Sequence, residues 1–236
     1  SFAKVISEND RQVIEMELIS SNGRYEMDFD TYDATIPTNA KMVVLCSPHN
    51  PGGCVWTRSE LEQLAAFVRR HDLILVSDEI HHDLTFGAKH TPMALIKGIE
   101  DRLIMMTSTT KTFNIAGGHV GNVIIENPDL QVRFTKRMAA LGLSPNSFGL
   151  HMATAAYSQD GATWVDELIK YLDGNRELFD AGINAIPGLK SMRLEATYLA
   201  WVDFSGTGMT KEDFIARVEN HAKIAVNYGS TFGSGG

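Results

Sequence analysis

The segment V-S-D-E-I-H-H at 76–82 places a carboxylate and an imidazole directly after an apolar run, L-I-L at 73–75. Such a run is typical of a buried strand, so Asp78 and His81 are expected just past its end. Three kinds of site place an acid and an imidazole there. They are the acidic Mg²⁺ box of a nucleotide-dependent helicase, a metal cluster, and a carboxylate beneath a cofactor ring.

Further polar side chains follow apolar runs elsewhere in the chain. Asn50 lies in S-P-H-N-P-G-G, and Lys111 lies in S-T-T-K-T. A lysine in a partly desolvated site is disfavoured in its charged form, which makes it an amine nucleophile toward an aldehyde. The hydroxyls of Ser108 and Thr110 can hold a phosphate beside it. A lysine Schiff base with an acidic partner for a pyridinium nitrogen is the protein's part of pyridoxal phosphate (PLP) chemistry.

Alternating strand-like and helix-like segments must position these residues. Thr57 and Glu60 form a T-x-x-E capping box that predicts the start of a helix, and a second helix is expected at 128–140. Continuous apolar strands separated by helices predict an α/β fold, a mostly parallel sheet with helices on both faces. The predicted strands are 42–46, 73–77, 103–107 and 122–125.

The carboxyl ends of parallel strands are where ligands bind in such sheets. Asn50, Asp78 and Lys111 each follow one of these predicted ends. The three residues are therefore predicted to share one site.

The pattern changes from about residue 147 onward. Helices are expected at 147–159 and 162–185, and Trp164, Leu168, Tyr171 and Leu172 recur at helical spacing that indicates packing. Part of a smaller α+β C-terminal domain is predicted after them, with a strand at 199–204, a helix at 210–219 and a short strand at 224–226. The predicted division is a large PLP-binding domain at 1–160, lacking its N-terminal part, and an interdomain helix with a partial small domain at 161–236.

Composition narrows the classes of protein. The 236 residues carry 21 Lys and Arg against 29 Asp and Glu, a net charge of −8, which argues against a nucleic-acid partner because such binding depends on cationic side chains. The sequence shows neither an apolar run as long as a membrane span nor a signal peptide, so no membrane partner is expected. Cys46 and Cys54 make no disulfide framework, which favours a reducing cytoplasm.

The helicase and metal hypotheses each lack a required partner. A helicase needs a phosphate loop of the form G-x-x-x-x-G-K-[ST], and none occurs in this sequence. Adjacent residues seldom point at one ion, so no metal site is expected, and His82 and Asp83 are expected in a solvated turn. A structural, hydrogen-bonded imidazole remains an open alternative for His81. The cofactor hypothesis accounts for more of the strand-end residues.

Three motifs resemble a known family. N-P-G-G at 50–53, S-D-E-I-H at 77–81 and S-T-T-K-T-F-N-I-A-G at 108–117 resemble fold-type I PLP enzymes, the class I/II aminotransferases. P-H-N-P-G-G-x-V-W-T at 48–57 and K-H-T-P at 89–92 are most similar to the branch of cystathionine β-lyase-type C–S lyases. The similarity extends to T-Y-L-A-W-V-D at 197–203, and it implies a PLP-transferase-like large domain.

The resemblance implies roles for the strand-end residues. Lys111 would form the Schiff base with the cofactor and later move protons, and Asp78 would keep the pyridinium nitrogen protonated. Asn50 and His81 would contact the phenolate oxygen of the ring.

Other implied roles concern the phosphate and the assembly. Ser108 and Thr110 would bind the cofactor phosphate, and His119 stands where many relatives carry an arginine for it. The resemblance implies a cytoplasmic homodimer that acts on a small-molecule amino acid, as a C–S β-lyase or an aminotransferase. A regulatory, partner-binding use of the fold is the alternative. The family's glycine-rich loop and substrate-carboxylate arginine are not found in this sequence, so the chain is expected to be a fragment that is inactive by itself.

Overall fold

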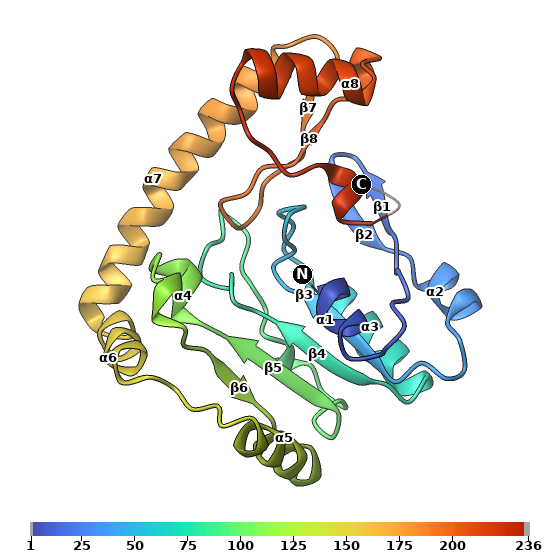
Figure 1. Cartoon of the computed structure of the whole chain (residues 1–236), viewed down its shortest axis with the longest axis vertical. Helices are drawn as coiled ribbons and strands as arrows, with labels where there is room; N and C mark the ends of the chain where they lie inside the picture. Colours follow the sequence, from blue (N-terminus) through green and yellow to red (C-terminus); the bar gives the residue numbers. More distant parts are fainter. Residues whose placement is uncertain (1, 234–236) are drawn as a thin grey trace.

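A four-stranded sheet in the order β3-β4-β5-β6 forms the centre of the computed structural model, which describes residues 2–233 (Figure 1). The strands β3 (Met42–Cys46), β4 (Ile74–Asp78) and β5 (Leu103–Thr107) are parallel, and β6 (Asn122–Ile124) pairs antiparallel with β5. The predicted mostly parallel sheet is confirmed, with one antiparallel strand added.

The register brings the ends of the parallel strands together. Cys46 of β3 lies opposite Asp78 of β4, which lies opposite Met106 of β5. The loops that follow these strands therefore leave from one edge of the sheet.

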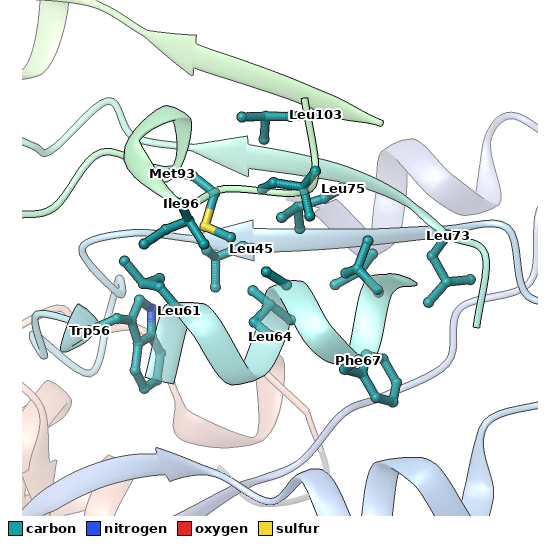
Figure 2. Packing of buried hydrophobic residues seen from close by; sticks show 14 of the residues in the cluster. Leu45, Trp56, Leu61, Leu64, Phe67, Leu73, Leu75, Met93, Ile96 and Leu103 are labelled. Atoms are coloured by element: carbon teal, nitrogen blue, oxygen red, sulfur yellow. The ribbon is translucent and has the colours of Figure 1, made fainter. Parts of the chain in front are cut away.

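Helix α3 (Arg58–Arg70) packs on the sheet, and the predicted capping box begins it. The Thr57 side chain accepts from the backbone of Glu60, and the Glu60 side chain accepts from the backbone of Thr57. Figure 2 shows Leu61 and Leu64 of α3 beside Leu45 of β3, where all three are buried. Truncating a buried leucine of this kind commonly costs about 2–5 kcal/mol of stability. The core therefore fixes the strands whose ends carry the polar residues.

The N-terminal region contains elements that are not among the predicted ones. Helix α1 (Phe2–Ser7) precedes a hairpin of β1 (Leu18–Ser21) and β2 (Arg24–Met27), and α2 (Phe29–Thr35) follows. Asn22 and Gly23 make the hairpin turn with φ of 51° and 77°. An Asn-Gly pair with two positive φ angles is a strong hairpin signal, so this element was readable from the sequence.

Within the described residues, four α-helices and a small sheet follow β6. They are α5 (Pro128–Ala140), α6 (Ser147–Ala156), α7 (Gln159–Asn184), the strands β7 (Lys190–Ser191) and β8 (Val202–Asp203), and α8 (Lys211–Phe214). The long helix α7 runs from α6 to the part of the chain that holds β7, β8 and α8 (Figure 1). The predicted helix at 128–140 is confirmed at both ends.

Several predictions for the second half are wrong. The strand expected at 199–204 comprises only Val202–Asp203, and residues 224–226 form no strand. The apolar side chains of Ile224 and Val226 are exposed, and a strand needs a neighbouring strand as well as β-branched residues. The helix expected at 210–219 begins with α8 and continues as a wider π-helix, Ile215–His221.

The apolar positions of α7 pack less than predicted. Trp164 stacks on Phe113 with ring centroids 5.5 Å apart, but Tyr171 is 69% exposed. Helical spacing reports which side chains share a face, and it does not report whether that face is covered. Within residues 2–233, no helix combines the length and the apolar character that crossing a membrane requires.

Candidate active site

The loop after β3 carries Asn50 to the sheet edge. Backbone bonds from His49 N to Cys54 O (2.9 Å) and from Gly53 N to His49 O (2.8 Å) close the loop. Gly53 has a φ of 68°, and a Cβ there would lie 2.3 Å from a Leu194 methyl group. The left-handed φ favours glycine at this position, and a larger residue would also have to displace the Leu194 methyl group.

Asn50 pairs with His81 across this edge. Asn50 Nδ2 lies 3.3 Å from His81 Nε2. An amide nitrogen only donates, so Nε2 of His81 accepts and Nδ1 carries the proton. Burial, with a smaller contribution from the charge of Lys111, lowers the pKa of His81 to about 4, so the ring is neutral near pH 7. His81 Nδ1 is buried and has no hydrogen-bond partner, which leaves one donor free for a ligand.

Asp78 is the last residue of β4, and its carboxylate faces both a backbone donor and Lys111. Asp78 Oδ1 accepts from Ile80 N at 3.3 Å. Burial raises the pKa of Asp78, while the backbone bond and the charge of Lys111 lower it. Lys111 therefore acts electrostatically on Asp78 as well as on His81. The amine, the acid and the imidazole lie in one site, as predicted.

Lys111 is half-buried on the short helix α4 (Thr109–Thr112), which Ser108 caps. Ser108 Oγ accepts from Thr110 N at 3.0 Å, donates to Val120 O at 2.7 Å and lies 2.7 Å from Thr110 Oγ1. Because Ser108 donates to a carbonyl, Thr110 donates to Ser108. Both hydroxyl protons are engaged, so an anion at this position would require one hydroxyl to rotate.

His119 is exposed and has a left-handed φ of 45°. It immediately precedes Val120, whose carbonyl accepts from Ser108. The residue therefore sits on the backbone that closes the Ser108 end of the site, and its role toward a ligand stays a prediction.

His82 and Asp83 lie in a turn, as expected, with side chains 24% and 31% exposed, and both also make hydrogen bonds within the protein. His82 Nδ1 lies 2.7 Å from Glu79 O, and Asp83 Oδ2 accepts from Thr112 Oγ1 at 2.9 Å. The turn thus connects the end of β4 to the helix that carries Lys111. The bond from Thr112 to Asp83 joins residues 29 positions apart, and local sequence pattern carries no signal for such a distance. Among the described residues, no group of three or more His, Cys, Asp or Glu side chains is arranged to hold a metal ion.

Residues 193–197, here called the crossing segment, connect the second half of the chain to two loops of the site. Glu195 N and Ala196 N donate to Gly53 O at 2.8 and 2.9 Å. Thr197 N donates to Leu84 O at 2.8 Å. The crossing segment therefore ties the Asn50 loop to the turn after His81.

Tyr198 extends the site directly after the crossing segment. Its ring meets the His81 ring edge to face, with centroids 5.6 Å apart. Thr197 beside it has a φ of 71°, a conformation that is strained for a β-branched residue. Neither residue is among the predicted site residues, although both belong to the T-Y-L-A-W-V-D motif.

The site thus combines a primary amine, a carboxylate, a neutral imidazole and an amide. Together these groups can hold a polar aromatic ring, keep a proton at one side of it and capture a carbonyl carbon at the other.

A family model for aminotransferase class I and II matches residues 1–236. Cystathionine beta-lyase PatB of Bacillus subtilis (strain 168) is 33% identical over 240 residues, covering all of this chain and 62% of the relative. Protein MalY of Escherichia coli (strain K12) is 32% identical over 241 residues, covering all of this chain and 61% of the relative. The chain spans about 60% of the length of these curated relatives.

Solved structures give the same result. The crystal structure of cystalysin from Treponema denticola, which contains a pyridoxal 5′-phosphate cofactor, is 36% identical with a TM-score of 0.93, covering 100% of this chain and 61% of that one. The PLP-bound C-S lyase from Staphylococcus hominis is 31% identical with a TM-score of 0.86, covering 98% and 60%. The names of these relatives and solved structures do not favour the helicase hypothesis or a solely partner-binding protein.

Proposed function

Because the chain belongs to the class I and II aminotransferase family, we propose that it carries the cofactor-binding residues of a PLP-dependent enzyme that acts on amino acids. The observation that carries the proposal is the pairing of Asn50 with His81 at 3.3 Å, which leaves the buried His81 Nδ1 without a partner. Asp78 at the end of β4 and Lys111 on α4 follow neighbouring strands of the same sheet. An amine within reach of an acid and a neutral imidazole, at the carboxyl edge of a parallel sheet, suits a pyridine aldehyde.

The residues present fit PLP. His81 Nδ1 is a buried donor without a partner, which suits the ring oxygen of the cofactor. Asp78 is a half-buried acid that suits the ring nitrogen. Ser108 and Thr110 are hydroxyls at the start of α4 and suit the phosphate once a hydroxyl proton turns toward it. When bound, PLP supplies an aldehyde that captures amines and a ring that accepts electrons from the substrate carbon.

Each of these residues has a separate proposed role. Lys111 Nζ would hold the aldehyde carbon of the cofactor and would move a proton to and from the substrate carbon. The Asp78 carboxylate holds the proton on the ring nitrogen, and the paired Asn50 and His81 orient the ring. His119 is proposed at the phosphate end, beside the Ser108–Val120 bond.

A C–S β-lyase is the first candidate reaction and an aminotransferase the second, because relatives of both names are similar to this chain. With a thiolate on the substrate's Cβ, the C–S bond breaks, the thiolate leaves, and hydrolysis yields pyruvate and ammonia. Without such a leaving group, the amino group passes to a keto acid.

The test uses the full-length protein mixed with PLP. We expect a visible absorbance band that Lys111→Ala removes and that Lys89→Ala, a change at an exposed lysine, keeps. Incubation with cystathionine should release ammonia and pyruvate if the enzyme is a lyase. Amino exchange that depends on a keto acid, without ammonia, would identify an aminotransferase. A Lys111→Ala variant with the wild-type band would refute the proposal.

Assembly, compartment and domain division are further proposals. Phe148 of α6 and Leu178 of α7 are exposed large apolar residues, which supports a homodimer that covers them. Cys46 and Cys54 are free thiols, which supports a cytoplasmic location. The start of α7 at Gln159 supports a division near residue 160.

A further inference from the structure

A buried acid–imidazole pair lies directly behind Asp78. The side chains of Glu79 and His90 are 1% and 7% exposed, and Glu79 Oε2 lies 2.8 Å from His90 Nε2. His90 belongs to the K-H-T-P motif, to which the proposed function assigns no role.

Three donors face the Glu79 carboxyl group. Besides His90, the hydroxyl of Ser77 and the backbone N–H of Met93 both donate to Oε1 at 2.9 Å. These three contacts hold the Glu79 carboxyl group in one position. The pair thereby fastens the end of β4 to the segment that contains His90 and Met93.

The position of Glu79 determines where Asp78 points. Successive side chains of a strand point to opposite faces. Glu79 N donates to Met106 O at 2.8 Å, so the β4–β5 ladder continues through this residue. With the Glu79 side chain buried on one side of the strand, the Asp78 side chain is directed to the opposite side, where the charge of Lys111 acts on it.

Stability alone is a weak reason for such a pair. Replacing a buried ion pair with apolar residues of similar volume is often neutral or stabilising. The pair also has an electrostatic effect on the site, because the Glu79 charge is one of the causes, after burial, that raise the pKa of Asp78. The same negative charge favours any positive charge that a ligand holds beside Asp78.

We propose that Glu79, held by His90, is a positioning residue for Asp78. It fixes the direction of the Asp78 carboxylate and adds a second negative charge behind it, so that the protonated form of the bound cofactor is favoured. This inference rests on the proposed PLP site. If the wild-type protein binds no PLP, the proposed function fails; if it binds PLP and the variants below behave as wild type, only this inference fails.

The test is a pH titration of the visible absorbance of the full-length protein loaded with PLP. Glu79→Gln keeps the shape and removes the charge, so we expect the midpoint pH of the absorbance change to fall by about half a unit or more. We also expect the Kd for PLP to rise about tenfold. A merely structural role would lower the Tm and leave the midpoint unchanged.

Two further variants keep the test decisive. His90→Gln keeps a donor and the Glu79 charge, so the midpoint should stay or rise while PLP binding weakens. Tyr32→Phe removes a buried hydroxyl that bonds Glu17 O, away from the site, and serves as the control for lost stability. A Glu79→Gln protein with the wild-type midpoint and Kd would overturn the inference. If Glu79→Gln does not fold, PLP binding by His90→Gln equal to that of Tyr32→Phe would overturn it.

Discussion

Arg24 joins three separate parts of the chain, and its removal should cost much more stability than removal of a surface arginine. Its Nη1 and Nη2 donate to the two oxygens of Glu60 at 2.7 and 2.9 Å, and Nη2 also donates to Val55 O at 2.8 Å. Its Nε lies 3.5 Å from Glu195 in the crossing segment. Arg24 thus holds the β1–β2 hairpin, the start of α3 and the crossing segment together.

The magnitude follows from burial and geometry. The side chains of Arg24 and Glu60 are 18% and 16% exposed, so the bidentate pair is largely removed from water. Breaking a buried pair by removing one partner costs about 3–5 kcal/mol, and the residual exposure places this case at about 2–3 kcal/mol. We expect Arg24→Ala to lower the free energy of unfolding by that amount at pH 7, measured by urea denaturation.

The pH dependence of this loss follows from Glu60. Burial alone would raise its pKa, but the hydrogen bond from Arg24 and those from Thr57 hold the pKa of Glu60 below its usual value. Such a group stabilises the fold above the pKa of the unfolded chain, and the contribution is lost as pH falls through the folded pKa. The difference between wild type and Arg24→Ala should therefore shrink below about pH 4.

The control is Arg58→Ala on the same helix. Arg58 pairs with Glu62 at 3.5 Å, but the two side chains are 55% and 57% exposed, so this change should cost less than about 0.5 kcal/mol. Equal losses for Arg24→Ala and Arg58→Ala would refute the reasoning.

Two further predictions concern the site. Asp78→Asn in the full-length protein should lower kcat/KM about 100-fold, because a preorganised charge beside the reacting group is commonly worth about 3 kcal/mol. Steady-state kinetics would measure this loss, and near wild-type rates would contradict the role of Asp78. Burial lowers the pKa of His81 to about 4. Between about pH 6.5 and pH 4, the unfolded chain therefore binds a proton at His81 that the folded chain does not bind. The free energy of unfolding consequently decreases as the pH is lowered through that window. Urea unfolding at pH 7 and pH 5 should show a smaller loss, by about 1 kcal/mol, in His81→Gln than in wild type, and an equal loss would show that His81 is not buried in its neutral form.

The strand ends were predictable because their signals are local. A continuous apolar run followed by a polar residue locates Asp78 to within a residue of the end of β4 and places Lys111 on the short helix that follows β5. Parallel topology brings such ends to one edge. The capping box of Thr57 and Glu60 was readable for the same reason, since its two members lie three positions apart. The Asn22-Gly23 turn carried an equally local signal for the hairpin that was not among the predictions.

Contacts between distant positions were not predictable from pattern. Through the bond from Thr112 to Asp83, the expected turn also supports α4, and no sequence pattern near either residue indicates this bond. The engaged hydroxyls of Ser108 and Thr110 likewise depend on Val120, which lies beyond the motif that identified them. The strand expected at 224–226 failed for the related reason that propensity does not supply a neighbouring strand.

The crossing segment limits how the two halves of the molecule can move. Its main-chain N–H groups bond Gly53 O on one side and Leu84 O on the other, next to the loops that carry Asn50 and His81. A rigid rotation of the β7–β8 region would have to break these bonds or displace both loops in the same direction. If these bonds stay intact, a hinge that moves the β7–β8 region must therefore bend the chain on both sides of the crossing segment, before residue 193 and after residue 197.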